Sequence, residues 1–167
     1  MKQSAGILLY RQVATGVEVL LVHPGGPFWA NKDIGSWSMP KGEFEAGEEP
    51  LAAARREFEE EIGSPPPNGS YAALGEVKQA GGKVVHAFVL ESDFNLERFH
   101  SNMFEMEWPP KSSHKQEFPE NDKAAWTPLS TAKHKVVKGQ VPFIEELARR
   151  TGHDLNEPPP SAQSSLF

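Results

Sequence analysis

Four glutamates are concentrated near the end of one short segment, EFEEEI, at positions 57, 59, 60 and 61. A helix advances about 100° per residue, so i,i+3 and i,i+4 spacing places Glu57, Glu60 and Glu61 on one face. Glu59 points elsewhere, beside Arg55. Three converging carboxylates repel one another, and a hard divalent cation would remove that cost. Carboxylate oxygens suit Mg²⁺ or Mn²⁺, so the spacing indicates a metal site.

The helix alone also fits a solvated acidic face that is partly paired with Arg55 and Arg56, because Glu-rich surface helices are common. The residues before it favour the metal site. Gly42 begins a loop, Glu48 follows six positions on, and Arg56 follows eight positions after that. A match at this many spaced positions is far more specific than a lone glycine motif.

The complete string follows the Nudix box, G-x5-E-x7-R-E-U-x-E-E-x-G-U, where U is a bulky apolar residue. Only the last position departs, since Ser64 stands there, and this change concerns packing after the helix. The chain therefore resembles the Nudix hydrolases over about residues 4–150. The resemblance implies an α/β fold, the Nudix α/β/α sandwich with a mixed β-sheet and the Nudix loop-helix.

The resemblance also implies an activity. Nudix enzymes hydrolyse a nucleoside diphosphate linked to another group, X, with Mg²⁺ or Mn²⁺ as cofactor and water attacking a phosphorus. Arg56 would pair with Glu48 or Glu57 and orient them. The metal ligands carried over from the family are the Gly42 carbonyl and the carboxylates of Glu57, Glu60 and Glu61.

A catalytic base is also needed. Many family members place a further glutamate before a late strand that carries a tryptophan, and here Glu120 lies six residues before Trp126. We favour Glu120 over its neighbour Glu117, and both also fit solvated loop acids. Glu60 is the third candidate, because a glutamate of the box can itself activate the water.

Two residues near the box are candidates for substrate contacts. Lys41, directly before Gly42, would meet a phosphate as a mobile point charge, or lie exposed in a loop. Trp37 would stack on a base, as would Phe28 or Trp29, although core packing fits each of them as well.

The segment WSMPKGE resembles hydrolases of dinucleoside polyphosphates and some nucleoside triphosphate pyrophosphohydrolases. The segment 101–126, with the start SAGILLYR, resembles a bacterial subgroup of predicted NTP pyrophosphohydrolases. The region VKQAGG lacks the proline that often marks ADP-ribose enzymes. The expected substrate is thus a dinucleoside polyphosphate or a (d)NTP, and the alternative is a catalytically silent module that binds or senses nucleotides.

The elements that must position these residues can be read from pattern. Aliphatic runs predict strands at 7–10, 17–23 and 124–129, and a hairpin around residues 80–82 is expected to join strands 71–79 and 83–91. Pro50 and Gly63 bound the clearest helix. A second helix is expected over 141–150, and residues 92–122 read as a long irregular loop.

Composition limits the remaining possibilities. The 167 residues suit one domain, expected at 1–152, with a disordered tail at 153–167. The net charge of −6 disfavours a general nucleic-acid binder. The absence of cysteine excludes disulfides and suggests a cytoplasmic protein. No apolar run is long enough for a membrane span, so no membrane partner is expected, whereas a homodimer is possible because dimers are common in the family.

Overall fold

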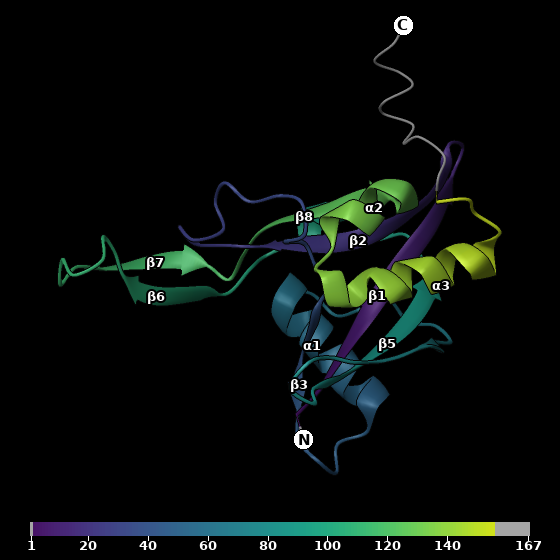
Figure 1. Cartoon of the computed structure of the whole chain (residues 1–167), viewed down its shortest axis with the longest axis horizontal. Coiled ribbons are helices and arrows are strands. Elements are labelled where there is room, and N and C mark those ends of the chain that lie inside the picture. The colour runs from purple at the N-terminus through teal and green to yellow at the C-terminus, as the bar shows by residue number, and fades with distance from the viewer. Residues whose placement is uncertain (1, 156–167) are drawn as a thin grey trace, which may run out of the picture.

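The computed structural model describes residues 2–155, and β1 (Gln3–Val13) is its central strand (Figure 1). Residues 4–9 are buried without exception, which is typical of a strand covered on both faces. β1 pairs in parallel with β5 (Val84–Glu91) and antiparallel with β2 (Gly16–Pro24) and β3 (Lys41–Phe44). The sheet is therefore mixed, as the resemblance implies.

The sheet has six strands in the order β4-β5-β1-β2-β8, with β3 paired to β1. Its remaining members are β4 (Ala72–Lys78) and β8 (Asn121–Pro128). The helices are α1 (Pro50–Ile62), α2 (Leu129–Lys135) and α3 (Val141–Thr151), with short 3-10 turns η1 (Leu96–Arg98) and η2 (Lys138–Gln140).

Alternate residues of β1 supply two separate cores. Ile7 and Leu9 pack with Phe58 of α1 on one face of the sheet. Leu8 packs with Phe143 of α3 and with α2 on the opposite face. Helices thus cover both faces (Figure 1), which is the predicted α/β/α sandwich.

Helix α1 carries the acidic segment and begins and ends where its caps lie. The side chain of Glu49 accepts hydrogen bonds from the backbone N–H groups of Leu51 and Ala52, and Pro50 occupies the first turn. Gly63 ends the helix with φ of 84°, a left-handed conformation that favours glycine. The buried residues are Ala53, Ala54, Phe58 and Ile62.

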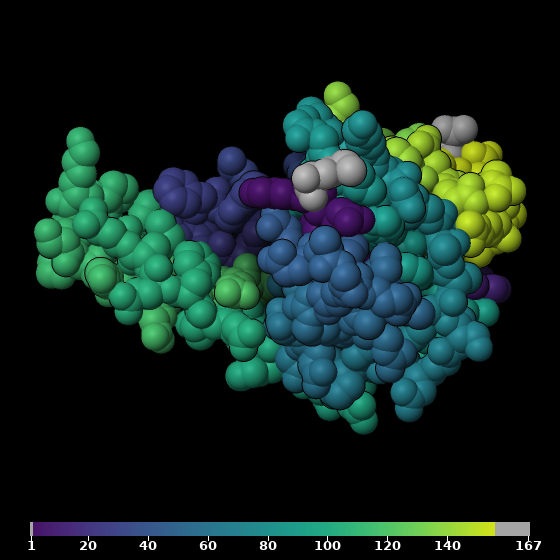
Figure 2. Space-filling view, turned by 90° about the horizontal axis from the view of Figure 1, so that it is seen from below, coloured from purple at the N-terminus to yellow at the C-terminus, as the bar shows by residue number. Residues whose placement is uncertain are grey.

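The prediction of an irregular loop over residues 92–122 is wrong. This segment contains η1 and a hairpin of β6 (Met103–Glu107) and β7 (Lys115–Pro119), which pair with each other outside the main sheet. The hairpin projects from the body of the molecule (Figures 1 and 2). Its strands carry alternating charges and few β-branched residues, so the sequence pattern for a strand is weak.

The bounds of two strands and of the C-terminal segment differ slightly from those predicted. β1 begins at Gln3 and β8 at Asn121, in both cases before the expected residues. Leu155 packs against the α2–α3 core, and the rest of the expected tail, 156–167, lies outside the described residues. Among the helices described, none is long and apolar enough to cross a membrane.

Candidate active site

The acids of α1 differ in burial and in the strands they contact. Glu57 contacts β3 and Glu61 contacts β8, and both are half-buried, whereas Glu59 and Glu60 are both exposed. The side chain of Glu57 is 12% exposed and that of Glu60 is 55% exposed. Burial raises the pKa values of Glu57 and Glu61, because the charged carboxylate loses water.

Gly42 in β3 lies directly against the carboxylate of Glu57. A Cβ atom added at Gly42 would overlap the carboxylate group of Glu57. Any side chain at position 42 would therefore displace this acid. The box glycine thus leaves room for a carboxylate beside the backbone of β3.

Arg56 connects the loop acid to the helix acids. Its Nε and Nη2 atoms each donate to Glu48 at 3.0 Å, and Nη1 donates to Glu57 at 2.7 Å. Nη1 also lies 3.5 Å from Glu60. The paired guanidinium lowers the pKa of Glu48, and the acids raise the pKa of Arg56. Arg56 pairs with both acids proposed from the sequence, not with one of them.

Asn121 was missed by sequence reasoning. It is buried at the start of β8, and its side-chain N–H donates to the carboxylate of Glu61. This hydrogen bond lowers the pKa of Glu61, against the larger effect of burial. In the sequence, only the position of Asn121 directly after Glu120 could have indicated that it belongs to the site.

The two base candidates outside α1, Glu120 and Glu117, lie in different parts of the structure. The backbone of Glu120 is fixed by two hydrogen bonds of 2.8 Å, to Gly25 and Asn102, and its negative charge contributes to the raised pKa of Glu61. Glu117 lies in β7, opposite Glu105, on the projecting hairpin. Of these two acids, Glu120 is the one beside the acids of α1.

A cleft of about 780 Å³ lies beside Glu61 and Asn121. Lys41 lines it, and burial lowers the pKa of this lysine. Trp29 also lines the cleft and is 39% exposed. Two further lysines on its wall come from β4 and η2, namely Lys78 and Lys138.

The prediction that Trp37 contacts substrate is corrected by its burial. Trp37 is 6% exposed, packs in the α2–α3 core and donates from Nε1 to Asp33 at 2.7 Å. Its ring also lies 5.1 Å from that of His23. Tryptophan prefers such half-polar core positions when its N–H has a partner. Trp29 is the tryptophan that a ligand in the cleft can reach.

A buried histidine holds the loop that carries Trp29. His23 is 1% exposed, with Nδ1 2.7 Å from Asp122 Oδ1 and Nε2 2.6 Å from the Lys32 carbonyl. Both partners are hydrogen-bond acceptors. The link ties the loop to β8, next to Asn121.

The chemical type of the candidate ligand atoms suits a hard divalent cation. The Gly42 carbonyl and the carboxylates of Glu57, Glu60 and Glu61 offer only oxygen. Within residues 2–155, however, no three acids or histidines are grouped closely enough to hold a metal ion. Arg56 binds Glu57, and Asn121 binds Glu61. Convergence on one ion requires changes of side-chain rotamer.

Comparison with known proteins identifies the family. Residues 2–147 match the model of the NUDIX domain. Over 64 residues the chain is 44% identical to an RNA pyrophosphohydrolase of Rhodospirillum rubrum, an alignment that covers 36% of this chain and 37% of that protein.

Two solved structures show a similar fold. A binary complex of Caenorhabditis elegans Ap4A hydrolase has a TM-score of 0.59 and 19% identity, over 91% of this chain and 98% of that one. The NUDIX domain of Shewanella oneidensis NrtR, crystallised with ADP ribose, has a TM-score of 0.58 and 18% identity, over 89% and 86% of the two chains.

Proposed function

The chain belongs to the NUDIX domain family, and we propose that it is a hydrolase of pyrophosphate bonds, which cleaves a nucleoside diphosphate linked to a group X in a divalent-metal-dependent reaction. The observation that carries the proposal is the placement of Glu57, Glu60 and Glu61 on one side of α1, with Arg56 holding two of them and the cleft beside Glu61.

We propose dinucleoside polyphosphates or (d)NTPs as the substrates. The similar structure is named as an Ap4A hydrolase and the similar sequence as an RNA pyrophosphohydrolase, so a triphosphate at an RNA 5′ end is a further substrate to test. Lys41, Lys78 and Lys138 on the cleft wall supply positive charge for a polyphosphate. Trp29 offers a ring on which a base can stack.

In the proposed reaction the oxygen of a water molecule bonds to a phosphorus, and the phosphoric anhydride bond to the leaving phosphate breaks. Glu120 takes the proton of the water, with Glu60 as the alternative base. Lys41 orients a phosphate and offsets its charge. Arg56 holds Glu48 and Glu57 in place.

The residues that would hold Mg²⁺ or Mn²⁺ are Gly42, Glu57, Glu60 and Glu61. When bound, the cation supplies charge neutralisation at the phosphate oxygens, which is the main requirement of phosphoryl transfer. Arg56 and Asn121 then act by orienting the carboxylates.

The test is product analysis by anion-exchange chromatography after incubation with Mg²⁺ or Mn²⁺. The panel contains diadenosine tetraphosphate, the common (d)NTPs, a 5′-triphosphate RNA, ADP-ribose and NADH. Glu61→Gln is expected to lower turnover about 100-fold or more. Glu59→Gln, two residues away on the exposed side of α1, is the matched control and should keep full turnover.

Equal turnover by the two variants would refute the proposed role of the α1 acids. Nucleotide binding without cleavage of any panel member, under either metal, would instead support the alternative of a silent binding or sensing module.

A further inference from the structure

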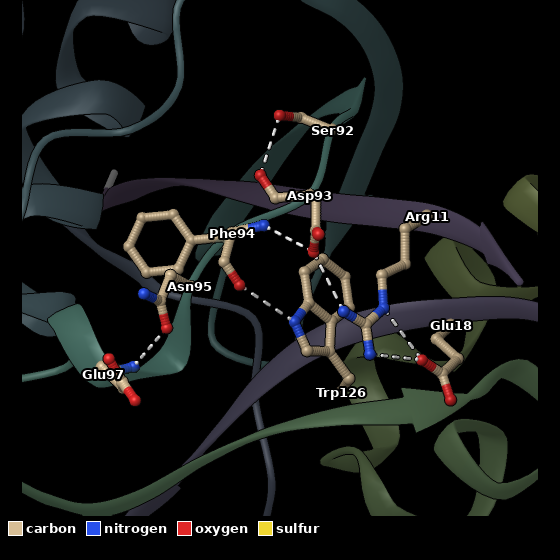
Figure 3. Close-up of polar contacts among 8 residues, drawn as sticks. All are labelled: Arg11, Glu18, Ser92, Asp93, Phe94, Asn95, Glu97 and Trp126. Carbon is tan, nitrogen blue, oxygen red and sulfur yellow. Dashed lines mark hydrogen bonds and ion pairs between the residues drawn. The ribbon is translucent and has the colours of Figure 1, made fainter.

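A second cleft, of about 930 Å³, lies away from the acidic face of α1. Its wall includes Arg55 of α1, Arg98 of η1 and Trp126 of β8 (Figure 3 shows the Trp126 side). None of the candidate metal ligands lines it. Arg55 and its neighbour Arg56 extend from α1 in different directions, since Arg55 lies over the ring of Tyr71 while Arg56 binds the box acids.

This cleft concentrates positive charge in an acidic chain. Three of the six arginines in the sequence line it, against one acid, Asp93. The other three arginines are paired with acids elsewhere. Within residues 2–155, Arg55 and Arg98 form no ion pair, so their guanidinium groups are available to an anion.

The third arginine is held in place instead. Arg11 donates at 2.9 Å to both Glu18 and Asp93, and its guanidinium carbon lies 4.3 Å from the ring centre of Trp126. The Trp126 N–H donates to the Phe94 carbonyl at 3.2 Å. Figure 3 shows this stack of guanidinium on indole. Arg11 therefore fixes the indole instead of serving as a free charge.

Part of the wall is apolar. Phe94 is buried and packs edge-on against Phe58 of α1, with ring centres 5.6 Å apart. Leu96 and the run Pro65, Pro66 and Pro67 complete the apolar part, and Asn68 and Asn95 also line the cleft. A bare anion would leave this surface without contacts, and an apolar ligand would leave two guanidinium groups unpaired. The volume falls in the range of small-molecule sites, about 300–1,000 Å³.

We propose that this cleft is a second ligand site, which binds a nucleoside phosphate of mononucleotide size. Arg55 and Arg98 bind the phosphate, and the base lies against the surface formed by Trp126, Leu96 and the prolines. The site is independent of the proposed catalytic reaction, because it shares no residue with the cleft beside Glu61.

The four tryptophans make the test specific, because each reports on a different region. Trp126 lies in this cleft, Trp29 in the cleft beside Glu61, Trp37 in the core and Trp108 at the hairpin. The probe is AMP, which contains no phosphoric anhydride bond and is not consumed by a pyrophosphohydrolase. AMP is titrated into the ¹⁵N-labelled full chain without metal, and the indole N–H signals are followed after assignment by Trp→Phe variants.

AMP is expected to shift the Trp126 signal with saturation. Arg98→Ala and Arg55→Ala should each weaken this binding about tenfold or more, because each removes a charged hydrogen-bond donor. Arg149→Ala, an exposed arginine on α3, is the matched control and should leave it unchanged. Melting temperatures confirm that the variants fold.

Three results would overturn the proposal. A shift confined to Trp29 would place AMP in the other cleft, and unchanged affinity in the Arg55→Ala, Arg98→Ala double variant would remove the role of the arginines. Equal affinity for inorganic phosphate or for adenosine would show that the cleft does not recognise the two parts of a nucleoside phosphate together.

Discussion

Asn121 and Glu61 lie 60 residues apart in sequence, and the side-chain N–H of the first donates to the carboxylate of the second. The bond joins the start of β8 to the last turn of α1. Both side chains also line the cleft of about 780 Å³. Glu61 is therefore held by a partner on a different element, and a hydrogen bond of this kind fixes the direction of a carboxylate.

Replacing Asn121 is expected to reduce catalysis by loosening Glu61. Asn121→Ala and Asn121→Asp both remove the donor, and each should lower kcat/KM about 10–100-fold. Steady-state hydrolysis of the best panel substrate measures this. Asn31→Ala, at an exposed position of the loop that follows β2, is the control. Full activity of Asn121→Ala would show that Glu61 needs no partner from β8.

Gly42→Ala is expected to lose activity and some stability, because the added Cβ would overlap the carboxylate of Glu57. Overpacking of this kind costs about 1–3 kcal/mol in the free energy of unfolding. Chemical denaturation and hydrolysis rates measure the two effects. Gly152→Ala is the control, since its φ of 71° is unfavourable for alanine but no atom lies within 4 Å of an added Cβ. It should lose stability without losing activity.

Trp29→Ala is expected to raise KM roughly tenfold with little change in kcat, because base stacking contributes about 1–3 kcal/mol. Ile34→Ala is the control from the same loop, where Ile34 is exposed and does not line the cleft. An unchanged KM in Trp29→Ala would mean that the base binds elsewhere.

Asp122→Ala is expected to destabilise the loop that carries Trp29. It removes the acceptor for His23 Nδ1 and leaves a buried polar group without its partner, at a cost of about 1–3 kcal/mol. The free energy of unfolding, measured with denaturant, should fall, and KM should rise. Glu59→Ala, which removes an exposed acid of α1, tests whether the loss of a surface carboxylate alone has this effect. Equal stability of Asp122→Ala and the unmodified chain would contradict the role given to this link.

The ion pairs of Glu146 should make stability depend on pH. Arg149 and Arg150 lower the pKa of Glu146 from 4.5 to about 2. Because the folded-state pKa is the lower one, the stabilisation is present above pH 4.5 and is lost as pH falls towards 2. The melting temperature of Glu146→Gln should thus lie below that of the unmodified chain at pH 7, and the difference should shrink with acidification.

The control for this comparison is Glu145→Gln, since Glu145 is exposed and forms no ion pair within residues 2–155. Its melting temperature should follow that of the unmodified chain across the same pH range. The effect of Glu146 itself is expected to be small, because exposed ion pairs are screened by solvent. A difference that persists at pH 2 would contradict the assignment.

The sequence by itself determined the local part of this protein. Glu57, Glu60 and Glu61 share a face because helical geometry fixes the direction of residues three and four apart. The pairing of Arg56 with Glu48 could be predicted because Glu48 lies in the loop directly before α1 and Arg56 lies in that helix. Pro50 and Gly63 bound α1 through their own backbone restrictions, and the central strands followed from aliphatic runs.

The tertiary structure decided what depends on distant contacts. Trp29 and Trp37 are eight residues apart and chemically identical, yet packing buries one in the core and leaves the other in a cleft. The β6–β7 hairpin, the pairing of Asn121 with Glu61, and the gathering of Arg55 and Arg98 beside Trp126 each join segments that lie far apart in the chain. No local pattern encodes such pairs, because side-chain direction in a sheet and burial between layers depend on which elements finally pack together.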